Sequence, residues 1–217
     1  MTRALIFANG VIEDGEMVQR SLTDADDALI IAADGGARVA AHYGRRVDAV
    51  IGDMDSLTAD ELAALQAQHA TILRHPAEKD ETDLELALMW AVEQGADWLR
   101  VIGATGGRLD QMLSNIYLLA LPILDGRDVK LVAGVQATWL ARAGRIEIDG
   151  SVGDTISLIP LNGTVHGVTT EALYYPLKDE DLYFGPARGV SNVMTTTRAA
   201  VTVRAGVLLV VHTIGRA

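Results

Sequence analysis

The 217-residue chain has no cysteine, few basic residues and no long hydrophobic run, and each shortage excludes a class of protein. Without cysteine there are no disulfides, thiolate nucleophiles or zinc–cysteine sites, which fits a reducing compartment. Eighteen Lys and Arg against 29 Asp and Glu give a formal net charge of −11 at pH 7, so phosphate backbones of nucleic acids are poor partners. No stretch reaches the roughly 18 apolar residues of a membrane span, and the N-terminal apolar run is too short for a signal sequence. We therefore expect a cytoplasmic protein that binds neither nucleic acid nor membrane.

What is present is typical of a folded chain. Hydrophobic residues make up 49% and charged residues 22% of the sequence. The length allows one large domain or two small ones, and it suffices for a hydrophobic core without staples.

The first part of the chain alternates short apolar runs with longer helical patterns. The expected strands are Ala4–Ala8, Ala28–Ala33, Ala49–Ile51, Thr71–Leu73, Leu99–Ile102 and Val129–Val132. The expected helices are Gly36–Tyr43, Ala59–Gln68, Thr82–Gln94 and Gln111–Ala120. This alternation predicts a mostly parallel sheet flanked by helices. Thr82 and Glu85 have the spacing of a capping box, and Gly95 stands where that helix should stop.

The pattern changes near residues 134–137, after which short strand-like runs follow one another without a helix. They are Thr138–Ala141, Arg145–Ile148, Thr155–Ile159, Thr164–Val168, Val193–Thr197, Ala200–Val203 and Val207–His212. Turn signals such as Asn162-Gly163 separate them. The fold class expected is therefore α/β over residues 1–135, followed by an all-β sandwich domain over residues 136–217.

Acidic residues follow two of the predicted strands directly. Asp34-Gly35-Gly36 comes after one, and Gly52-Asp53-Met54-Asp55-Ser56 after the next. In open α/β sheets ligands bind outside the carboxyl ends of the strands, so these side chains should line a crevice. Asp53 and Asp55 could converge on one ion, for which Mg²⁺ is the natural choice. The alternative is an Asx-type turn with solvated charges.

Two further clusters open predicted helices. Lys79 to Glu85 begins one of them, and its acids could simply cap the helix, but Lys79 is also an available phosphate partner. Gly103 to Gln111 is a glycine-rich turn into a helix N-terminus, where backbone amides and Arg108 could cradle a phosphate. This turn is neither a Walker loop nor the dinucleotide-binding fingerprint, which argues against an NAD-dependent oxidoreductase. Carboxylates and glycines at three successive sheet ends favour Mg²⁺-nucleotide chemistry.

Other kinds of site find less support. The five His residues show no metal-ligand spacing, so we expect them to be solvated or structural. A Gly-x-Ser-x-Gly elbow is absent, which argues against a serine hydrolase.

Taken together, the clusters resemble the signature of the thiamine pyrophosphokinase family. The family pattern of Asp-Gly-Gly, Gly-Asp-x-Asp-Ser, Asp-x-Thr-Asp and Gly-Gly-Arg-x-Asp-(His/Gln) is matched, in this order, by Asp34–Gly36, Gly52–Ser56, Asp80–Asp83 and Gly106–Gln111. The second half also resembles the family, at Gly167–Thr170, Leu173–Leu177 and Gly189–Asn192. One departure is Ala172, where the family usually has glycine.

The resemblance implies an α/β nucleotide-binding domain followed by a β-sandwich, assembled as a homodimer. It also implies transfer of the diphosphate of ATP to the hydroxyl of thiamine, giving thiamine diphosphate and AMP. Carried onto this sequence, Asp53, Asp55 and Asp83 would hold Mg²⁺, with Asp110 in or beside that set. One of these carboxylates would accept the hydroxyl proton, and Asp83 is the residue we favour.

The resemblance assigns the substrates to different parts of the chain. ATP would be held by Asp34, Gly35, Gly36, Gly106, Gly107 and Arg108, with Lys79 as an added phosphate contact. Thiamine would be held by the β domain, where Tyr175 would stack on a thiamine ring across the dimer interface, near Ser191 and Asn192. From the residues alone, Tyr175 could equally be an edge-strand packing residue.

Two rival functions share much of this pattern. A pyrophosphokinase acting on a pterin alcohol would use the same acidic clusters, so only the β half distinguishes it. A non-catalytic sensor of thiamine or nucleotide could dispense with a metal-binding carboxylate, whereas this chain keeps every acid of the pattern.

Overall fold

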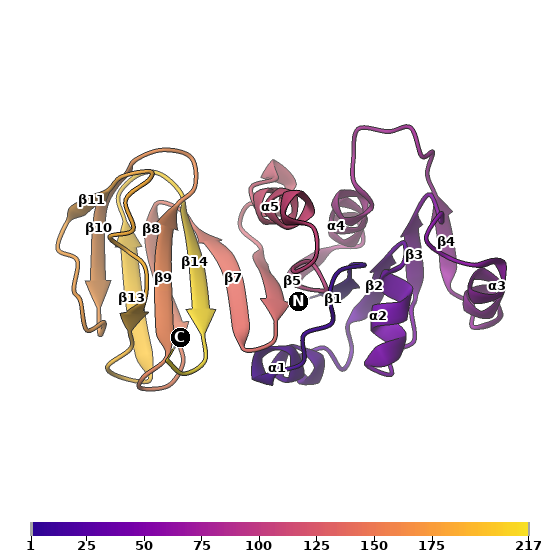
Figure 1. The fold of residues 1–217 in the computed structure, drawn as a ribbon, viewed down its shortest axis with the longest axis horizontal. Coiled ribbons are helices and arrows are strands. Elements are labelled where there is room, and N and C mark those ends of the chain that lie inside the picture. The colour runs from indigo at the N-terminus through magenta and orange to yellow at the C-terminus, as the bar shows by residue number, and fades with distance from the viewer. Residues whose placement is uncertain (1, 217) are drawn as a thin grey trace. The chain divides into compact units, whose positions relative to one another are not determined.

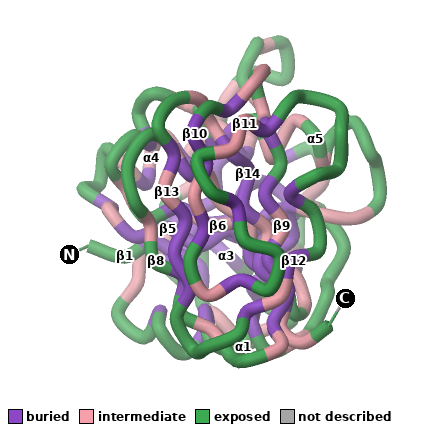
Figure 2. Tube along the Cα trace, turned by 90° about the vertical axis from the view of Figure 1, so that its left-hand side faces the viewer, coloured by how far each residue is buried: buried purple, intermediate pink, exposed green. Residues whose placement is uncertain are grey.

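The computed structural model of the protein describes residues 2–216, and the chain divides into two compact units, Met1–Gly134 and Val135–Ala217. We call these the N-terminal and C-terminal units. In Figure 2 the strands are largely buried and the connecting loops largely exposed.

The N-terminal unit is built on a parallel sheet with the strand order β6-β5-β1-β2-β3-β4 (Figure 1). Every pair of neighbouring strands in this part of the sheet is parallel. The strands are β1 (Thr2–Phe7), β2 (Leu29–Ala33), β3 (Ala49–Gly52), β4 (Thr71–Arg74), β5 (Ala96–Ile102) and β6 (Asp128–Ala133). The strand order reverses at β1, and ligands bind at such switch points in open α/β sheets.

Helices connect the parallel strands. They are α1 (Glu16–Asp24), α2 (Gly36–His42), α3 (Ala59–Ala67), α4 (Asp83–Glu93) and α5 (Leu109–Leu118), followed by a short 3₁₀ helix, η1 (Pro122–Leu124). The strand order, with the right-handed crossovers usual between parallel strands, implies that α1 to α3 cover one face of the sheet and α4 and α5 the other. Helix α4 packs on β2, β3 and β5, and α2 packs on β1 and β2.

Local sequence signals explain where α3 begins and where α4 begins and ends. Thr82 caps α4, because its hydroxyl accepts a hydrogen bond from the Glu85 amide at 3.2 Å. A complete capping box forms at α3, between Thr58 and Glu61. Gly95 ends α4 with a φ of +84°, a left-handed conformation that favours glycine.

The C-terminal unit consists of antiparallel strands. Its strands are β7 (Gln136–Ala141), β8 (Gly144–Asp149), β9 (Thr155–Pro160), β10 (Val165–Glu171), β11 (Glu180–Leu182), β12 (Asn192–Val193), β13 (Arg198–Val203) and β14 (Leu208–Thr213). They form two groups, ordered β12-β9-β14-β7 and β11-β10-β13-β8. Residues of both groups, such as Ile156 and Val201, share one buried hydrophobic cluster.

The fold class expected from the sequence is confirmed: a mostly parallel sheet with helices, then an antiparallel β region. Some element predictions were wrong. Helix α1 was not predicted, and the strand expected over Val193–Thr197 is limited to β12. Beyond β12 the chain bends away, and the Thr195 amide donates to the carbonyl oxygen of Ala172 at 2.9 Å. Among residues 2–216, no helix combines the length and apolar character needed to cross a membrane.

Candidate active site

Three carboxylates converge at the carboxyl edge of the parallel sheet. Asp34 directly follows β2, Asp53 directly follows β3, and Asp83 is the first residue of α4. Each contributes one oxygen to a group whose members all lie within 4.8 Å of one another. Asp34 is only 4% exposed, and its Oδ1 has no hydrogen-bond partner among residues 2–216. A buried carboxylate oxygen without a partner is costly, so this oxygen indicates a site for a ligand.

The backbone around this group is strained at Asp34 and has no space for a side chain at Gly52. Asp34 has a φ of +45°, a conformation that residues other than glycine seldom adopt and that is concentrated at functional sites. A Cβ atom on Gly52 would lie 2.9 Å from Cγ of Asp83 and 3.1 Å from Cβ of Asp34. Glycine at position 52 therefore allows the two carboxylates to approach each other.

Lys79 supplies positive charge to the group. Its Nζ lies 3.0 Å from Oδ1 of Asp83 and 3.9 Å from Oδ2 of Asp53, and its side chain is only 12% exposed. Burial raises the pKa of Asp83, the negative charges of Asp53 and Asp34 add to this, and together they outweigh the Lys79 ammonium, which lowers it. The three carboxylates thus carry more negative charge than one lysine compensates.

The carboxylates lie in a cavity of about 770 Å³ inside the N-terminal unit, a size suited to a nucleotide-sized ligand. Loops after β1, β2, β3 and β5 and the start of α4 line it. Of the predicted site residues, the lining includes Asp34, Asp53, Asp55, Lys79, Asp83, Gly106, Gly107 and Arg108. The structure therefore brings most of the predicted metal and ATP residues together, in the crevice expected from the strand order.

Gly35 and Gly36 do not line the cavity but shape its base. A Cβ on Gly36 would lie 1.9 Å from the carbonyl oxygen of Phe7, and one on Gly35 would meet the side chain of Asn9 at 2.5 Å. Both glycines are required because α2 begins directly against the loop that follows β1. Their contribution is close packing, which places Asp34 at the end of β2.

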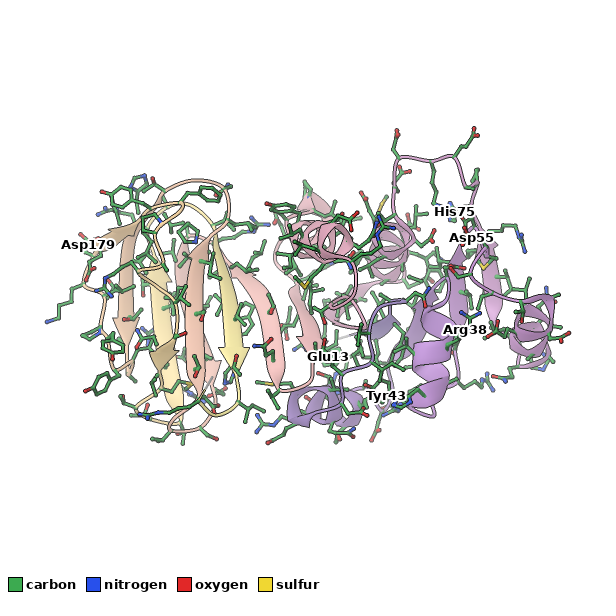
Figure 3. The ribbon with its side chains drawn as sticks, viewed as in Figure 1. Glu13, Arg38, Tyr43, Asp55, His75 and Asp179 are labelled. Atoms are coloured by element: carbon green, nitrogen blue, oxygen red, sulfur yellow. The ribbon has the colours of Figure 1, made fainter. Side chains whose placement is uncertain are left out.

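Asp55 stands slightly apart from the three converging carboxylates. Its amide donates a hydrogen bond to Oδ1 of Asp53 at 3.0 Å, which is the Asx-type turn considered as the alternative to a metal site. Arg38, on α2, and Asp55 are both labelled in Figure 3. The Arg38 guanidinium holds the same loop by donating to the carbonyl oxygen of Ser56 at 2.5 Å. The turn and the carboxylate group coexist, because the turn orients Asp53.

The glycine-rich turn between β5 and α5 forms another wall. Gly106 and Gly107 have φ values of +78° and +66°, which explains the pair of glycines. The side-chain amide of Asn115 donates to the carbonyl oxygen of Ala104 at 2.8 Å and fastens the turn to α5. The hydroxyl of Thr105, which lines the cavity, has no hydrogen-bond partner within residues 2–216. The turn thus contributes one hydroxyl without a partner to the cavity wall, as a phosphate-binding loop would.

Asp110 is separate from the acidic group. It is exposed, is not among the residues that line the cavity, and accepts hydrogen bonds from the Arg108 guanidinium at 2.6 and 3.2 Å. The hydrogen bond from Arg108 lowers the pKa of Asp110. The structure therefore places Asp110 where it orients Arg108.

The loop after β1 also lines the cavity, and sequence reasoning missed it. The amides of Gly10 and Val11 donate to the carbonyl oxygens of Gly103 and Thr105, at 2.8 and 3.2 Å. A Cβ on Gly10 would lie 2.2 Å from the oxygen of Gly103, so only glycine fits this crossing. The position alone could have indicated it, because Asn9-Gly10 directly follows the first predicted strand, as the acidic motifs follow theirs.

The residues expected to bind thiamine lie in the C-terminal unit. Tyr175 is 56% exposed, and its ring meets that of Tyr174 edge-on, with centroids 4.9 Å apart. This exposure disfavours a packing role for Tyr175 and leaves its ring face accessible. Ser191 is exposed and has a φ of +60°, and its amide donates to Oγ of Ser157 at 3.0 Å.

Asn192 is buried, with 5% of its surface exposed, and its amide group binds the backbone of Tyr175. Its Oδ1 accepts from the Tyr175 amide at 2.9 Å, and its Nδ2 donates to the Tyr175 carbonyl oxygen at 2.6 Å. Oδ1 also accepts from the Val193 amide. Asn192 therefore holds the segment that carries Tyr175, and we call this pair of bonds the Asn192 clamp.

A buried hydrogen-bonded pair elsewhere in the C-terminal unit accounts for one of the five histidines. Nε2 of His212 lies 2.8 Å from Oδ2 of Asp154, and both side chains are almost fully buried. Burial raises the pKa of Asp154, but hydrogen bonds from the Gly215 amide, His212 and the Ser151 amide outweigh it, so the pKa is lower than usual. The pair joins the end of β14 to the turn before β9.

Comparisons with known proteins agree with the two halves of the chain. The catalytic-domain model of thiamin pyrophosphokinase matches residues 21–131, and the vitamin B1 binding domain model of the same enzyme matches residues 145–208. Thiamine pyrophosphokinase of Bacillus subtilis is 30% identical over 162 residues, which cover 74% of this chain and 76% of that protein.

Solved structures agree as well. The crystal structure of the Bacillus subtilis thiamine pyrophosphokinase superposes with a TM-score of 0.86 at 27% identity and covers 99% of both chains. Yeast thiamin pyrophosphokinase shares the fold at 16% identity, with a TM-score of 0.80 over 98% of this chain and 86% of its own. The chain therefore belongs to the thiamine pyrophosphokinase family.

Proposed function

We propose that the cavity of the N-terminal unit binds ATP with Mg²⁺, and that the diphosphate of ATP passes there to the hydroxyl of thiamine. The thiamine diphosphokinase activity itself follows from family membership. What we add is the assignment of residues. The observation that carries it is the convergence of Asp34, Asp53 and Asp83 around a buried carboxylate oxygen without a partner.

The carboxylate group fits a divalent cation. It offers hard oxygen ligands within 4.8 Å of one another, and Mg²⁺ is usually held by one or two carboxylates together with substrate phosphates. Asp34, Asp53 and Asp83 would hold the ion, and Asp55 is near enough in sequence to Asp53 to assist. When bound, Mg²⁺ would neutralise phosphate charge and favour attack on the β-phosphorus.

The remaining cavity residues would hold the polyphosphate. Thr105, Gly106, Gly107 and Arg108 line the cavity, and their backbone amides, the Thr105 hydroxyl and the Arg108 guanidinium would donate to the phosphate oxygens. Asp110 would keep the Arg108 fork in place. Asp83, whose pKa is raised chiefly by burial, is the carboxylate we assign to accept the proton of the attacking hydroxyl.

The C-terminal unit would bind thiamine. The exposed ring of Tyr175 offers a face on which the cationic thiazolium or the pyrimidine ring could stack. Ser191 would hydrogen-bond the substrate, and Asn192 would act through the clamp on Tyr175. We further propose a homodimer with the thiamine site near its interface, and the cytoplasmic location remains a prediction.

The rival functions differ in the molecule that accepts the diphosphate, or in having no acceptor. A pterin-alcohol pyrophosphokinase would share the N-terminal cavity, but the match of residues 145–208 to a vitamin B1 binding domain supports thiamine. A sensor would bind nucleotide or thiamine without turnover.

An AMP-release assay with ATP and Mg²⁺ compares thiamine, a hydroxymethyl pterin and no acceptor. We expect AMP and thiamine diphosphate with thiamine alone. AMP with the pterin alone would overturn our assignment of the C-terminal unit, and binding without AMP would favour the sensor.

A further inference from the structure

We propose that Lys79 is an exchangeable cation: it occupies the carboxylate group before metal binds, and moves to the polyphosphate when metal and nucleotide arrive. This inference rests on the proposed metal site. It makes Lys79 a positioning residue that couples the binding of metal to the binding of nucleotide.

The first support is where the Lys79 ammonium lies. It contacts Asp83 at 3.0 Å and lies 3.9 Å from Asp53, so it sits against two of the three residues that would hold the metal. Its side chain is only 12% exposed, although a surface lysine normally extends into water. Lys79 is therefore the cation that contacts two of these carboxylates, and the Arg38 guanidinium also attracts the third, Asp34.

The second support is that this compensation is incomplete. Three carboxylates face one ammonium, and Oδ1 of Asp34, buried in the same group, has no hydrogen-bond partner within the described part of the chain. A divalent cation would compensate the charge more fully and provide a partner for that oxygen. It would also repel the ammonium that contacts Asp83, so Lys79 would have to leave.

The third support is a destination within the same cavity. Lys79 and Arg108 are the two cationic side chains among the lining residues, and Arg108 is already paired with Asp110. The triphosphate of ATP would bring several negative charges into this space. A lysine has a flexible four-carbon stem and three rotatable donors, so it can exchange a carboxylate for a phosphate without movement of the backbone.

This exchange predicts positive coupling between the two ligands. Metal binding releases Lys79 for the phosphates, and phosphate binding draws Lys79 away from the metal site. Each ligand therefore strengthens the binding of the other through the same side chain.

The test is the binding of Mn²⁺, as a spectroscopic probe for the metal, to Lys79→Gln. Glutamine removes the charge and keeps a comparable length. Free Mn²⁺ is counted by electron paramagnetic resonance, and the affinity for α,β-methylene ATP, which resists the transfer reaction, is measured by calorimetry with saturating Mn²⁺. We expect Lys79→Gln to bind Mn²⁺ alone about 10-fold more tightly, because its competitor is gone. The analogue should bind about 10-fold more weakly, because a phosphate partner is lost.

Two controls accompany this variant. Lys79→Arg keeps the positive charge and should bind Mn²⁺ much as the wild type does. Lys178→Gln makes the same charge change at an exposed position of the C-terminal unit and should leave Mn²⁺ binding unchanged. A melting curve for each variant shows whether it is folded.

The outcomes separate this inference from the function on which it rests. If Asp53→Asn weakens Mn²⁺ binding but Lys79→Gln does not tighten it, Lys79 is not a competitor and the inference is wrong, while the metal site stands. If Asp53→Asn binds Mn²⁺ as the wild type does, the metal-site assignment is wrong. A merely structural role for Lys79 would shift both affinities in the same direction, so opposite shifts support the exchange.

Discussion

Removal of the Asn192 clamp should weaken thiamine binding and leave ATP binding unchanged. In Asn192→Ala the backbone of Tyr175 loses two hydrogen bonds, of 2.9 and 2.6 Å, to a side chain that is buried. At roughly 1 kcal/mol each, the two bonds stabilise the Tyr175 segment by about 2 kcal/mol. If the released segment takes up its binding conformation correspondingly less often, the KM for thiamine rises up to about 30-fold.

The assay is steady-state AMP release, with thiamine and ATP varied in turn. We expect KM for thiamine to rise while KM for ATP stays within about twofold, because the clamp acts only on the segment that bears the stacking ring. Asn192→Asp provides a second variant: it keeps an acceptor for the Tyr175 amide, but places a carboxylate oxygen against the Tyr175 carbonyl, and should show a similar loss.

Asn162→Ala is the matched control, since Asn162 is exposed in an Asn-Gly turn of the same unit. It should leave both KM values unchanged. A folded Asn192→Ala protein with an unchanged KM for thiamine would refute the positioning role. So would an equal rise in both KM values, which would indicate a general loss of structure.

Three further predictions concern the C-terminal unit. Tyr175→Ala should raise KM for thiamine about 10-fold or more and leave KM for ATP unaffected, as the loss of one stacking ring requires; equal effects on the two substrates would argue against stacking. Ala172→Gly should raise the free energy of unfolding in urea by about 0.5–1 kcal/mol, because Ala172 has a φ of +57° and relief of that strain exceeds the entropic cost of glycine. A less stable variant would contradict this. The low pKa of Asp154 stabilises the fold above about pH 4, and this contribution is lost as the pH falls further through the folded-state pKa. Unfolding midpoints measured from pH 7 to pH 2 should therefore show that Asp154→Asn is less stable than wild type at pH 7, with the difference narrowing in acid, whereas a constant difference would show that the carboxylate charge is irrelevant.

Much of the fold and of the cavity could be predicted because parallel strands end at one edge of a sheet. Asp34 and Asp53 each follow a buried strand, so the rule that ligands bind at carboxyl ends is enough to assign both residues to one crevice. The glycine-rich turn after β5 followed from the same rule. Asn9-Gly10 obeys it too, but carries no charge and therefore gave no chemical signal.

Which carboxylates of the site lie together could not be predicted from the sequence, because this depends on backbone conformation. Asp53 and Asp55 looked equivalent as metal ligands, whereas the structure places Asp34 with Asp53 and Asp83. Asp34 and Met54, the residue after Asp53, both have left-handed φ values, and this backbone conformation sets the direction of the Asp34 and Asp53 carboxylates. The spacing of residues in a sequence does not reveal such a φ for a residue other than glycine.

Two other features depend on contacts between distant segments. Asn192 can reach the backbone of Tyr175 because β12 pairs with β9 in a register that opposes Asn192 to Ile156. Helix α1 was missed because its N-cap, Gly15, makes no side-chain hydrogen bond. The amides of Met17 and Val18 donate instead to the carbonyl oxygen of Gly134, more than a hundred residues later.

The central claim, that Asp34, Asp53 and Asp83 form the metal site for ATP, is tested most directly by thiamine-dependent AMP formation in Asp34→Asn and Asp55→Asn over a range of Mg²⁺ concentrations. Asparagine has the size of aspartate and tolerates the left-handed φ of position 34, so the fold should persist. We predict that Asp34→Asn lowers kcat by about 100-fold or more and requires more Mg²⁺, while Asp55→Asn loses less, since a metal ligand contributes several kcal/mol to transition-state stabilisation. Near-normal turnover in Asp34→Asn, with the larger loss in Asp55→Asn, would contradict the account.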